Sequence, residues 1–137
     1  MRGSKKIVTA SGKRKTAIAR ATIKPGVGRV RINNIPVEIL EPQIARSKVM
    51  EPLLQINPEL RNQIDIFTKV KGGGFMGQAE ATRIAIARGL IKWTKSKNLQ
   101  SVFTEYDRTM VAGDPRRKEA KKFGGPGARA KRQKSYR

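Results

Sequence analysis

The residues with the clearest chemical potential are a glycine-rich run at positions 72–77, in the pattern G-x-G-x-x-G. Glycines let a ligand approach the backbone closely, and free N–H groups at a helix N-terminus bind phosphate. The run follows an expected strand at residues 64–70 and opens an expected helix at residues 78–96. A dinucleotide site requires this setting, but a phosphate in an RNA backbone would suit the same groups. A flexible turn that only lets the helix pack is a third interpretation.

A dinucleotide site lacks its other parts. An acidic residue that binds the ribose is expected about 20 residues after the glycines. Lys95 and Lys97 occupy that region, and Glu105 comes too late. The chain also lacks the repeated parallel strands that build such a domain. The sequence therefore disfavours a nicotinamide enzyme and leaves an RNA phosphate and simple packing both open.

Two residue types that most enzymes depend on are missing. The 137 residues include no Cys and no His. This removes disulfides, thiolate chemistry and Cys-based zinc sites, together with the usual general base and the commonest metal ligand. We expect no enzymatic activity, no catalytic residue, no cofactor and no metal.

The net charge indicates a polyanionic partner. The chain has 31 Lys and Arg against 10 Asp and Glu, a net charge of +21, and such self-repulsion is tolerated mainly beside a polyanion. No stretch approaches the ~18 apolar residues of a membrane span, so nucleic acid is favoured over a membrane. The first ten residues have no apolar core of a secretion signal, which predicts an intracellular protein.

The charge is concentrated at the two ends of the chain. Residues 1–37 carry ten basic residues and no acid, residues 38–107 carry ten basic and eight acidic residues, and residues 108–137 carry eleven basic and two acidic. We therefore expect a globular domain at 1–107 and a basic extension at 108–137. The last eighteen residues hold seven Lys or Arg, no acid and a Gly-Pro break. They cannot fold alone and could reach about 60 Å when extended.

Hydrophobic periodicity predicts a mixture of strands and helices. Alternation predicts strands at 7–10, 16–23, 28–32, 35–40 and 64–70, and helices are expected from Pro42 to about Met50, at 78–96 and from about Asn98. Pro52 should interrupt or kink the first helix. Residues 11–15 should form a basic connection between strands, and residues 57–59 a loop. The small side chains of Ala17, Ala19 and Ala21 share one face, which indicates that another element packs closely there.

The two later helices suggest one basic face and one apolar face. Arg88, Lys92 and Lys95 form a basic stripe at helical spacing. We expect Arg88→Glu to lower RNA affinity more than domain stability. In the final helix, an i, i+3, i+4, i+7 pattern predicts a face directed at the core. Its members are Leu99, Val102, Phe103 and Tyr106.

Six blocks of sequence occur in a specific order and spacing. They are residues 11–20 (SGKRKTAIAR), 72–79 (GGG…GQA), 83–88 (RIAIAR), 107–108 (DR), 114–117 (DPRR) and 121–130 (KKFGGPGARA). Together they resemble the small-subunit ribosomal protein nine family in its archaeal and eukaryotic form. The tail differs from that of the bacterial form. The resemblance covers nearly the whole chain.

The resemblance implies an α/β (α+β) fold like the second domain of ribosomal protein five. This is a sandwich of a mainly four-stranded sheet with helices on one face, here with a long basic C-terminal tail that is disordered when free. It also implies a place in the head of the small subunit, in the cytoplasmic ribosome. The implied partners are small-subunit rRNA, peptidyl-site tRNA and neighbouring ribosomal proteins of the head. A membrane, a small-molecule substrate and a homo-oligomer are not expected.

The resemblance also implies roles for individual residues. The expected rRNA contacts are Lys13, Arg14, Lys15, Arg20, Lys71, Gly72, Gly73, Gly74, Arg88, Lys92, Arg116, Arg117, Lys121, Lys122 and Arg129. The tail would thread through RNA, and its tip would approach the anticodon stem-loop of the tRNA. The expected tRNA contacts are Lys134, Ser135, Tyr136 and Arg137. A free nucleic-acid chaperone or architectural protein would share the charge, and it stays open as an alternative.

Overall fold

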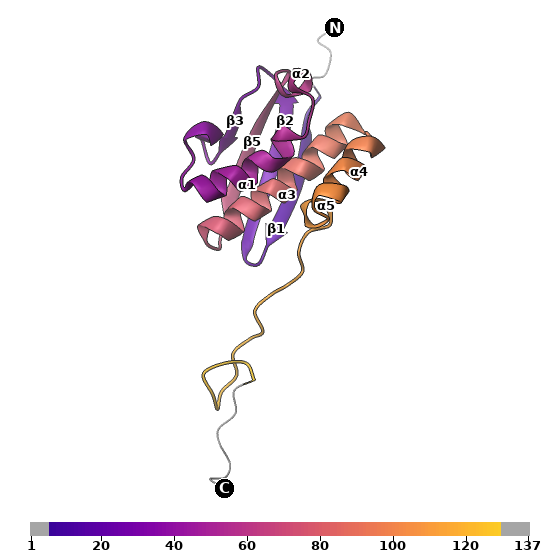
Figure 1. Cartoon of the computed structure of the whole chain (residues 1–137). Coiled ribbons are helices and arrows are strands. Elements are labelled where there is room, and N and C mark those ends of the chain that lie inside the picture. Colours follow the sequence, from indigo (N-terminus) through magenta and orange to yellow (C-terminus); the bar gives the residue numbers. More distant parts are fainter. Residues whose placement is uncertain (1–5, 130–137) are drawn as a thin grey trace.

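The computed structural model describes residues 6–129 and shows a sheet with helices on one of its faces (Figure 1). The sheet has five strands in the order β1-β2-β5-β3-β4. The pairs β1–β2, β2–β5 and β3–β4 are antiparallel, and β3–β5 is parallel. This confirms the predicted mixed fold, with the two-residue β4 added to four longer strands. The strands are β1 (Val8–Arg14), β2 (Ala17–Pro25), β3 (Val30–Ile32), β4 (Ile35–Pro36) and β5 (Ile64–Lys71).

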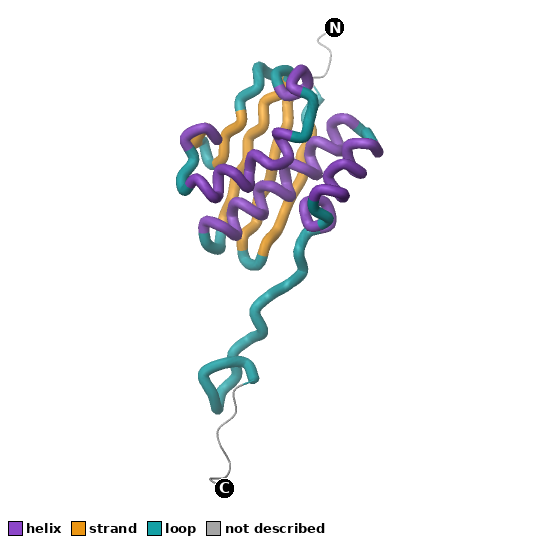
Figure 2. Tube along the Cα trace, viewed as in Figure 1, coloured by secondary structure: helices purple, strands orange, loops and turns teal. Residues whose placement is uncertain are grey.

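The helices supply the second layer (Figure 2). The helices are η1 (Val37–Ile39), which is a 3₁₀-helix, and α1 (Gln43–Leu54), α2 (Pro58–Arg61), α3 (Phe75–Thr94), α4 (Lys97–Tyr106) and α5 (Thr109–Ala112). The long helix α3 crosses β1 and β2 with α1 beside it, and α4 and α5 pack against α3 (Figure 1). Within residues 6–129, no helix is both long and apolar enough to cross a membrane.

Small residues let α3 lie directly on the sheet. Ala17, Ala19 and Ala21 are completely buried, as their spacing predicted. Gly12 on β1 leaves even less room, because a Cβ there would be 2.3 Å from the carbonyl oxygen of Ala81 on α3. Larger side chains such as Ile23 and Ile66 complete the core beyond this close contact. The tight packing fixes how α3 is placed over β1.

Several predicted boundaries were wrong. Residues 11–14 belong to β1, so only Lys15 and Thr16 turn the hairpin. The strand expected at 35–40 ends at Pro36, because proline has no N–H to continue the ladder, and η1 follows. The loop expected at 57–59 contains the start of α2, where the side chain of Asn57 accepts a hydrogen bond from the Glu59 N–H.

Pro52 does not end α1, so the expected interruption of this helix is wrong. The helix continues to Leu54, and Pro52 is buried in its last turn. A proline near a helix end removes one hydrogen bond but leaves little helix beyond it to disrupt. The helix therefore keeps its packing against α3.

The predicted core face of α4 is only half correct. Phe103 is completely buried and Leu99 packs partly against the core. Val102 and Tyr106 were wrongly predicted, since they are 44% and 57% exposed. The helix lies at the margin of the fold, beside α5 and the end of α3, so these neighbours cover only part of its apolar face.

The packed part of the chain continues through α5, which the sequence did not predict. Met110 in this helix is completely buried. After α5 the chain leads away from the sheet and helices (Figure 2). The division between residues 107 and 108 stays a prediction. The helix α5 falls within the predicted extension, although it packs against the domain.

Candidate nucleic-acid interface

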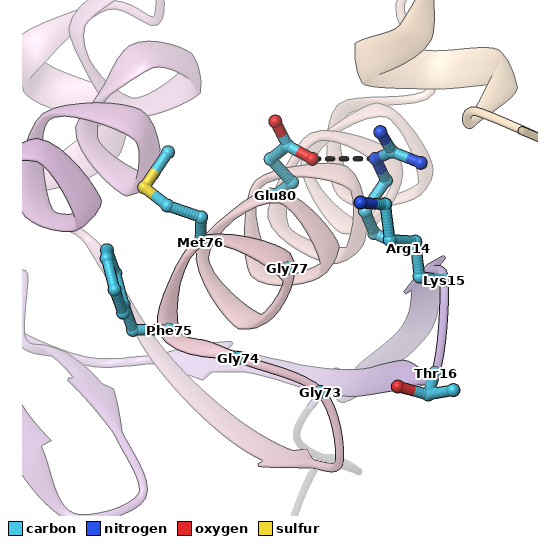
Figure 3. A pocket seen from close by; sticks show the side chains of 9 residues that line it. All are labelled: Arg14, Lys15, Thr16, Gly73, Gly74, Phe75, Met76, Gly77 and Glu80. Carbon is cyan, nitrogen blue, oxygen red and sulfur yellow. Dashed lines mark hydrogen bonds and ion pairs between the residues drawn. The ribbon is translucent and has the colours of Figure 1, made fainter. Parts of the chain in front are cut away.

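The glycine loop packs against the β1–β2 turn (Figure 3). Gly72 has φ +80°, and a Cβ there would lie 2.6 Å from the Thr16 carbonyl oxygen. Gly73 also has positive φ and lies against Ala17. The Gln78 side chain closes the loop by donating to the Gly72 carbonyl at 3.1 Å. Packing alone therefore accounts for glycine at these two positions.

The same loop leaves the N-terminus of α3 open. Its N-cap, Gly74, supplies no capping side chain, and the first turn holds no acidic residue. A hollow of about 370 Å³ lies between this helix end and the β1–β2 turn, where Lys15 is exposed (Figure 3). Unpaired N–H groups and the helix dipole give such an end a partial positive charge. The structure thus keeps the phosphate interpretation open beside the packing one.

The sheet does not fit a dinucleotide-binding domain. Such domains have open, mostly parallel sheets. Here the strand before the glycine loop, β5, is antiparallel to β2 and parallel only to the three-residue β3. Within the described residues, no cluster of three acidic, Cys or His side chains could hold a metal ion.

Arg14 is held by the protein itself. Its Nε donates to Glu80 Oε2 at 2.7 Å, one Nη donates to the Arg116 carbonyl at 3.2 Å, and the other lies 3.5 Å from Asp114 Oδ2. The side chain is only 12% exposed. Arg14 therefore joins the hairpin to α3 and to the beginning of the extension, and its role as an rRNA contact stays a prediction.

Asp114 attaches the extension to the edge of the sheet. It forms an isolated parallel bridge with Arg14 of β1. The Arg116 guanidinium binds both Asp114 carboxylate oxygens, with its Nε 3.0 Å from each. Hydrogen bonds from the Arg116 side chain and N–H, with the charges of Arg116 and Arg14, hold the pKa of Asp114 well below its ordinary value. This attachment fixes the point at which the chain leaves the domain.

Two of the three residues of the predicted basic stripe, Arg88 and Lys92, cover the outer edge of β1, and the third, Lys95, follows the last residue of α3 as its C-cap. Arg88 Nε donates to the Val111 carbonyl at 2.8 Å, and its Nη1 donates to the Ser11 carbonyl at 3.1 Å. Lys92 Nζ lies 3.3 Å from the Thr9 carbonyl in the same strand. Charged side chains of this kind protect an edge strand from pairing with other chains. The structural role of Arg88 argues against our expectation that Arg88→Glu would affect stability less than RNA affinity.

One buried arginine, Arg83, links α1, α3 and the start of α5, and the sequence did not reveal this role. Arg83 is 4% exposed, and its Nη1 lies 2.5 Å from Glu51 Oε2 and 3.2 Å from Asp107 Oδ2. Burial alone would raise the pKa of Asp107, but hydrogen bonds from Thr109 and the charge of Arg83 lower it on balance. The signal in the sequence was an arginine among apolar residues of a helix, which indicates a buried charge that needs an acidic partner.

The other predicted rRNA contacts lie in two places. Lys13, Arg20 and Lys71 project from the sheet face that carries no helix. The remainder lie in the extension, where Arg117 and Lys121 are exposed. Lys122 and Arg129 are exposed too, and both approach Glu119. The predicted tRNA contacts at positions 134–137 lie outside the described residues.

Similarity to known proteins identifies the family of this chain. A sequence model of the family described as ribosomal protein S9/S16 matches residues 12–137. The chain belongs to this family. It is 56% identical over 132 residues to the small ribosomal subunit protein uS9 of Methanothrix thermoacetophila, an alignment that covers 96% of this chain and 99% of the relative. It is 58% identical over 132 residues to the protein of the same name from Desulfurococcus amylolyticus, covering 96% and 94%.

Membership in the ribosomal protein S9/S16 family confirms several predictions. The resemblance to ribosomal protein nine is correct, and the two relatives come from archaea, as the form of the tail indicated. Proteins of this family are structural components and not enzymes. The prediction of a ribosomal protein of the cytoplasmic ribosome is likewise confirmed.

Proposed function

We propose that the chain is a structural constituent of the small ribosomal subunit head that binds small-subunit rRNA and extends its C-terminal tail to the peptidyl-site tRNA. The two relatives carry the name of a small-subunit protein. The observation that carries the proposal is the combination of a folded domain and a basic arm attached at one point. Residues 115–129 hold six basic residues against one acidic residue, and they lead away from the domain (Figure 1).

The mechanism is electrostatic. Lys and Arg side chains replace the counterions of folded RNA, and each phosphate contact contributes about −0.7 to −0.9 to the slope of log K against log[salt]. Exposed residues of the extension, including Arg117, Lys121 and Lys122, supply such contacts. No bond is made or broken, which agrees with the absence of Cys and His.

The β1–β2 turn and the N-terminus of α3 form a second proposed rRNA contact. Lys15 and Gly74 border the hollow between them (Figure 3). A phosphate there would accept hydrogen bonds from backbone N–H groups at the start of α3 and lie near the ammonium group of Lys15. Gly72 and Gly73 support this contact by letting the loop lie against Thr16 and Ala17. Neighbouring ribosomal proteins of the head would contact surfaces that RNA leaves free.

A truncation tests the tRNA part of the proposal. Deleting residues 133–137 removes Lys134 and Arg137 but no residue of the packed domain. The variant should enter small subunits normally and bind peptidyl-site tRNA more weakly than wild-type subunits at matched salt. Lys134→Gln/Arg137→Gln should reproduce the loss if charge is the cause. Unchanged tRNA affinity in both variants would refute the role of the tip.

A free nucleic-acid chaperone is the alternative that a binding test must separate, because a net charge of +21 would suit any RNA. The two candidates differ in stoichiometry. A ribosomal constituent is present once in each small subunit after high-salt washing, whereas a chaperone dissociates.

A further inference from the structure

The sheet face opposite the helices carries a group of cations, which we call the open sheet face. In the described part of the chain, the helices lie on the other side of the sheet (Figure 1). Strand alternation directs these side chains outward, and all are exposed except the half-buried Arg31. The cations are Lys13, Arg20, Lys24, Arg31, Lys69 and Lys71.

The strand register brings like charges together. Arg20 on β2 lies directly opposite Lys69 on β5. In the next row, Ile18 separates Lys13 on one side from Lys71 on the other. Neighbouring strands are about 4.8 Å apart, and like charges placed directly opposite destabilise a sheet. The free domain therefore bears a repulsion that a bound anion would relieve.

One carboxylate of the strands reaches this face, since Asp65 lies opposite Lys24 in the register, but the two form no ion pair in the described structure. Asp65 is the one acidic residue in the five strands. Its Oδ1 accepts hydrogen bonds from the N–H groups of Val27, Gly28 and Arg29, at 2.9–3.1 Å. Asp65 is thus already used to hold the turn before β3.

The helix side of the domain uses its cations differently. Arg14 and Arg83 form ion pairs there, and Arg88 and Lys92 bind backbone carbonyls. Within residues 6–129, none of the six cations of the open sheet face makes an ion pair or a side-chain hydrogen bond. These four cations therefore have partners within the protein, whereas the six of the open sheet face are available to a ligand.

We propose that the open sheet face is an additional RNA-docking surface, separate from the tail, that binds the phosphate backbone of folded RNA. This inference rests on the proposed function and adds Lys24, Arg31 and Lys69 to its contacts. Sheets that read single-stranded RNA stack bases on exposed aromatic rings. Here the one aromatic residue of the face, Phe67, is half-buried, and Lys24 Nζ lies 4.9 Å from its ring centre. The face therefore binds phosphates and does not stack bases.

A pair of charge-matched variants tests the surface by binding. The probe is protein-free archaeal small-subunit rRNA, titrated with the full chain over a range of salt concentrations. Arg20→Gln/Lys69→Gln should reduce the magnitude of the salt slope by about 1.4 to 1.8, which corresponds to two phosphate contacts. Its melting temperature should not fall, because the variant removes a repulsion. The control, Lys95→Asn/Lys97→Gln, removes the same charge from exposed positions at the junction of α3 and α4. Equal slopes for the two variants would overturn the proposal.

Site-directed cleavage tests the location, and the chain suits it because it has no Cys. An iron chelate attached to the thiol of Ser11→Cys would lie on the open sheet face, and one attached to Ala120→Cys would lie on the exposed extension. In reconstituted small subunits, both should generate hydroxyl radicals that cut rRNA. Cleavage from position 120 alone would overturn the docking surface and leave the proposed function intact. If a cross-linker attached at position 11 instead captured a protein, the open sheet face would be assigned to an acidic protein partner. Cleavage from neither position would contradict both proposals.

Discussion

The substitution Arg88→Met tests the assignment of this arginine to the fold. Methionine keeps most of the aliphatic stem but removes the two donors to Val111 and Ser11. A hydrogen bond from a charged group contributes about 1.5–3 kcal/mol when it is partly buried, and the exposed bond to Ser11 contributes less, about 0.5–1 kcal/mol. We therefore expect the free energy of unfolding to fall by about 2–4 kcal/mol. For a domain of this size, the melting temperature would drop by roughly 10 to 20 °C.

The assay is urea unfolding of the full chain, followed by circular dichroism and by fluorescence of the single tryptophan, Trp93. Arg20→Met is the matched control, because it removes an equal charge from an exposed arginine that makes no hydrogen bond in the described structure. Its free energy of unfolding should stay within about 0.5 kcal/mol of the wild-type value. Well below both melting temperatures, Arg20→Met should weaken rRNA binding more than Arg88→Met. Equal stabilities for the two variants would refute the assignment of Arg88 to the edge of β1.

Three further predictions concern the packing and the buried charges. Gly12→Val should destabilise the domain by about 3 kcal/mol or more in thermal unfolding, since a Cβ at position 12 would be 2.3 Å from the Ala81 carbonyl oxygen. The control Ser11→Val, on the exposed face of the same strand, should have a small effect. Phe103→Ala should cost about 3–5 kcal/mol in urea unfolding and the exposed Tyr106→Ala less than about 1 kcal/mol, so similar losses would contradict the packing of α4. The pKa of Asp107 is lowered in the folded state, so its contribution is present above the unfolded value near 3.9 and is lost as pH falls through the folded value. Melting temperatures measured from pH 6 to pH 2 should therefore decline less steeply below about pH 4 in Asp107→Asn than in wild type, and parallel curves would exclude this role.

Local patterns were sufficient to predict the main strands and the close packing of another element against one of them. Strict alternation in 16–23 and 64–70 marked the buried faces, and the alanines at 17, 19 and 21 predicted that another element would lie close, which is α3. Local patterns were insufficient for α4, because exposure of Val102 and Tyr106 depends on which neighbours reach that helix. The short helix α5 has too few residues for any periodicity to appear.

Sequence could identify the cations but not how each one is used. Arg88 and Arg20 both stand in regular patterns beside small residues, yet one binds backbone carbonyls and the other is exposed. That difference arises only when α3 lies along the outer edge of β1. The pairing of Arg14 with Glu80 and Asp114 likewise joins residues 66 and 100 positions apart (80 − 14 and 114 − 14). A site made by tertiary contacts of this kind cannot be read from spacing along the chain.

As a constituent of the small ribosomal subunit, this chain should be present in a fixed ratio to the subunit. The most direct test is quantitative mass spectrometry of the protein in small subunits purified from its own cells by sedimentation through high salt. We expect one copy for each small subunit, retained through the wash. A substoichiometric amount that the salt removes would contradict this expectation and would favour a free RNA chaperone.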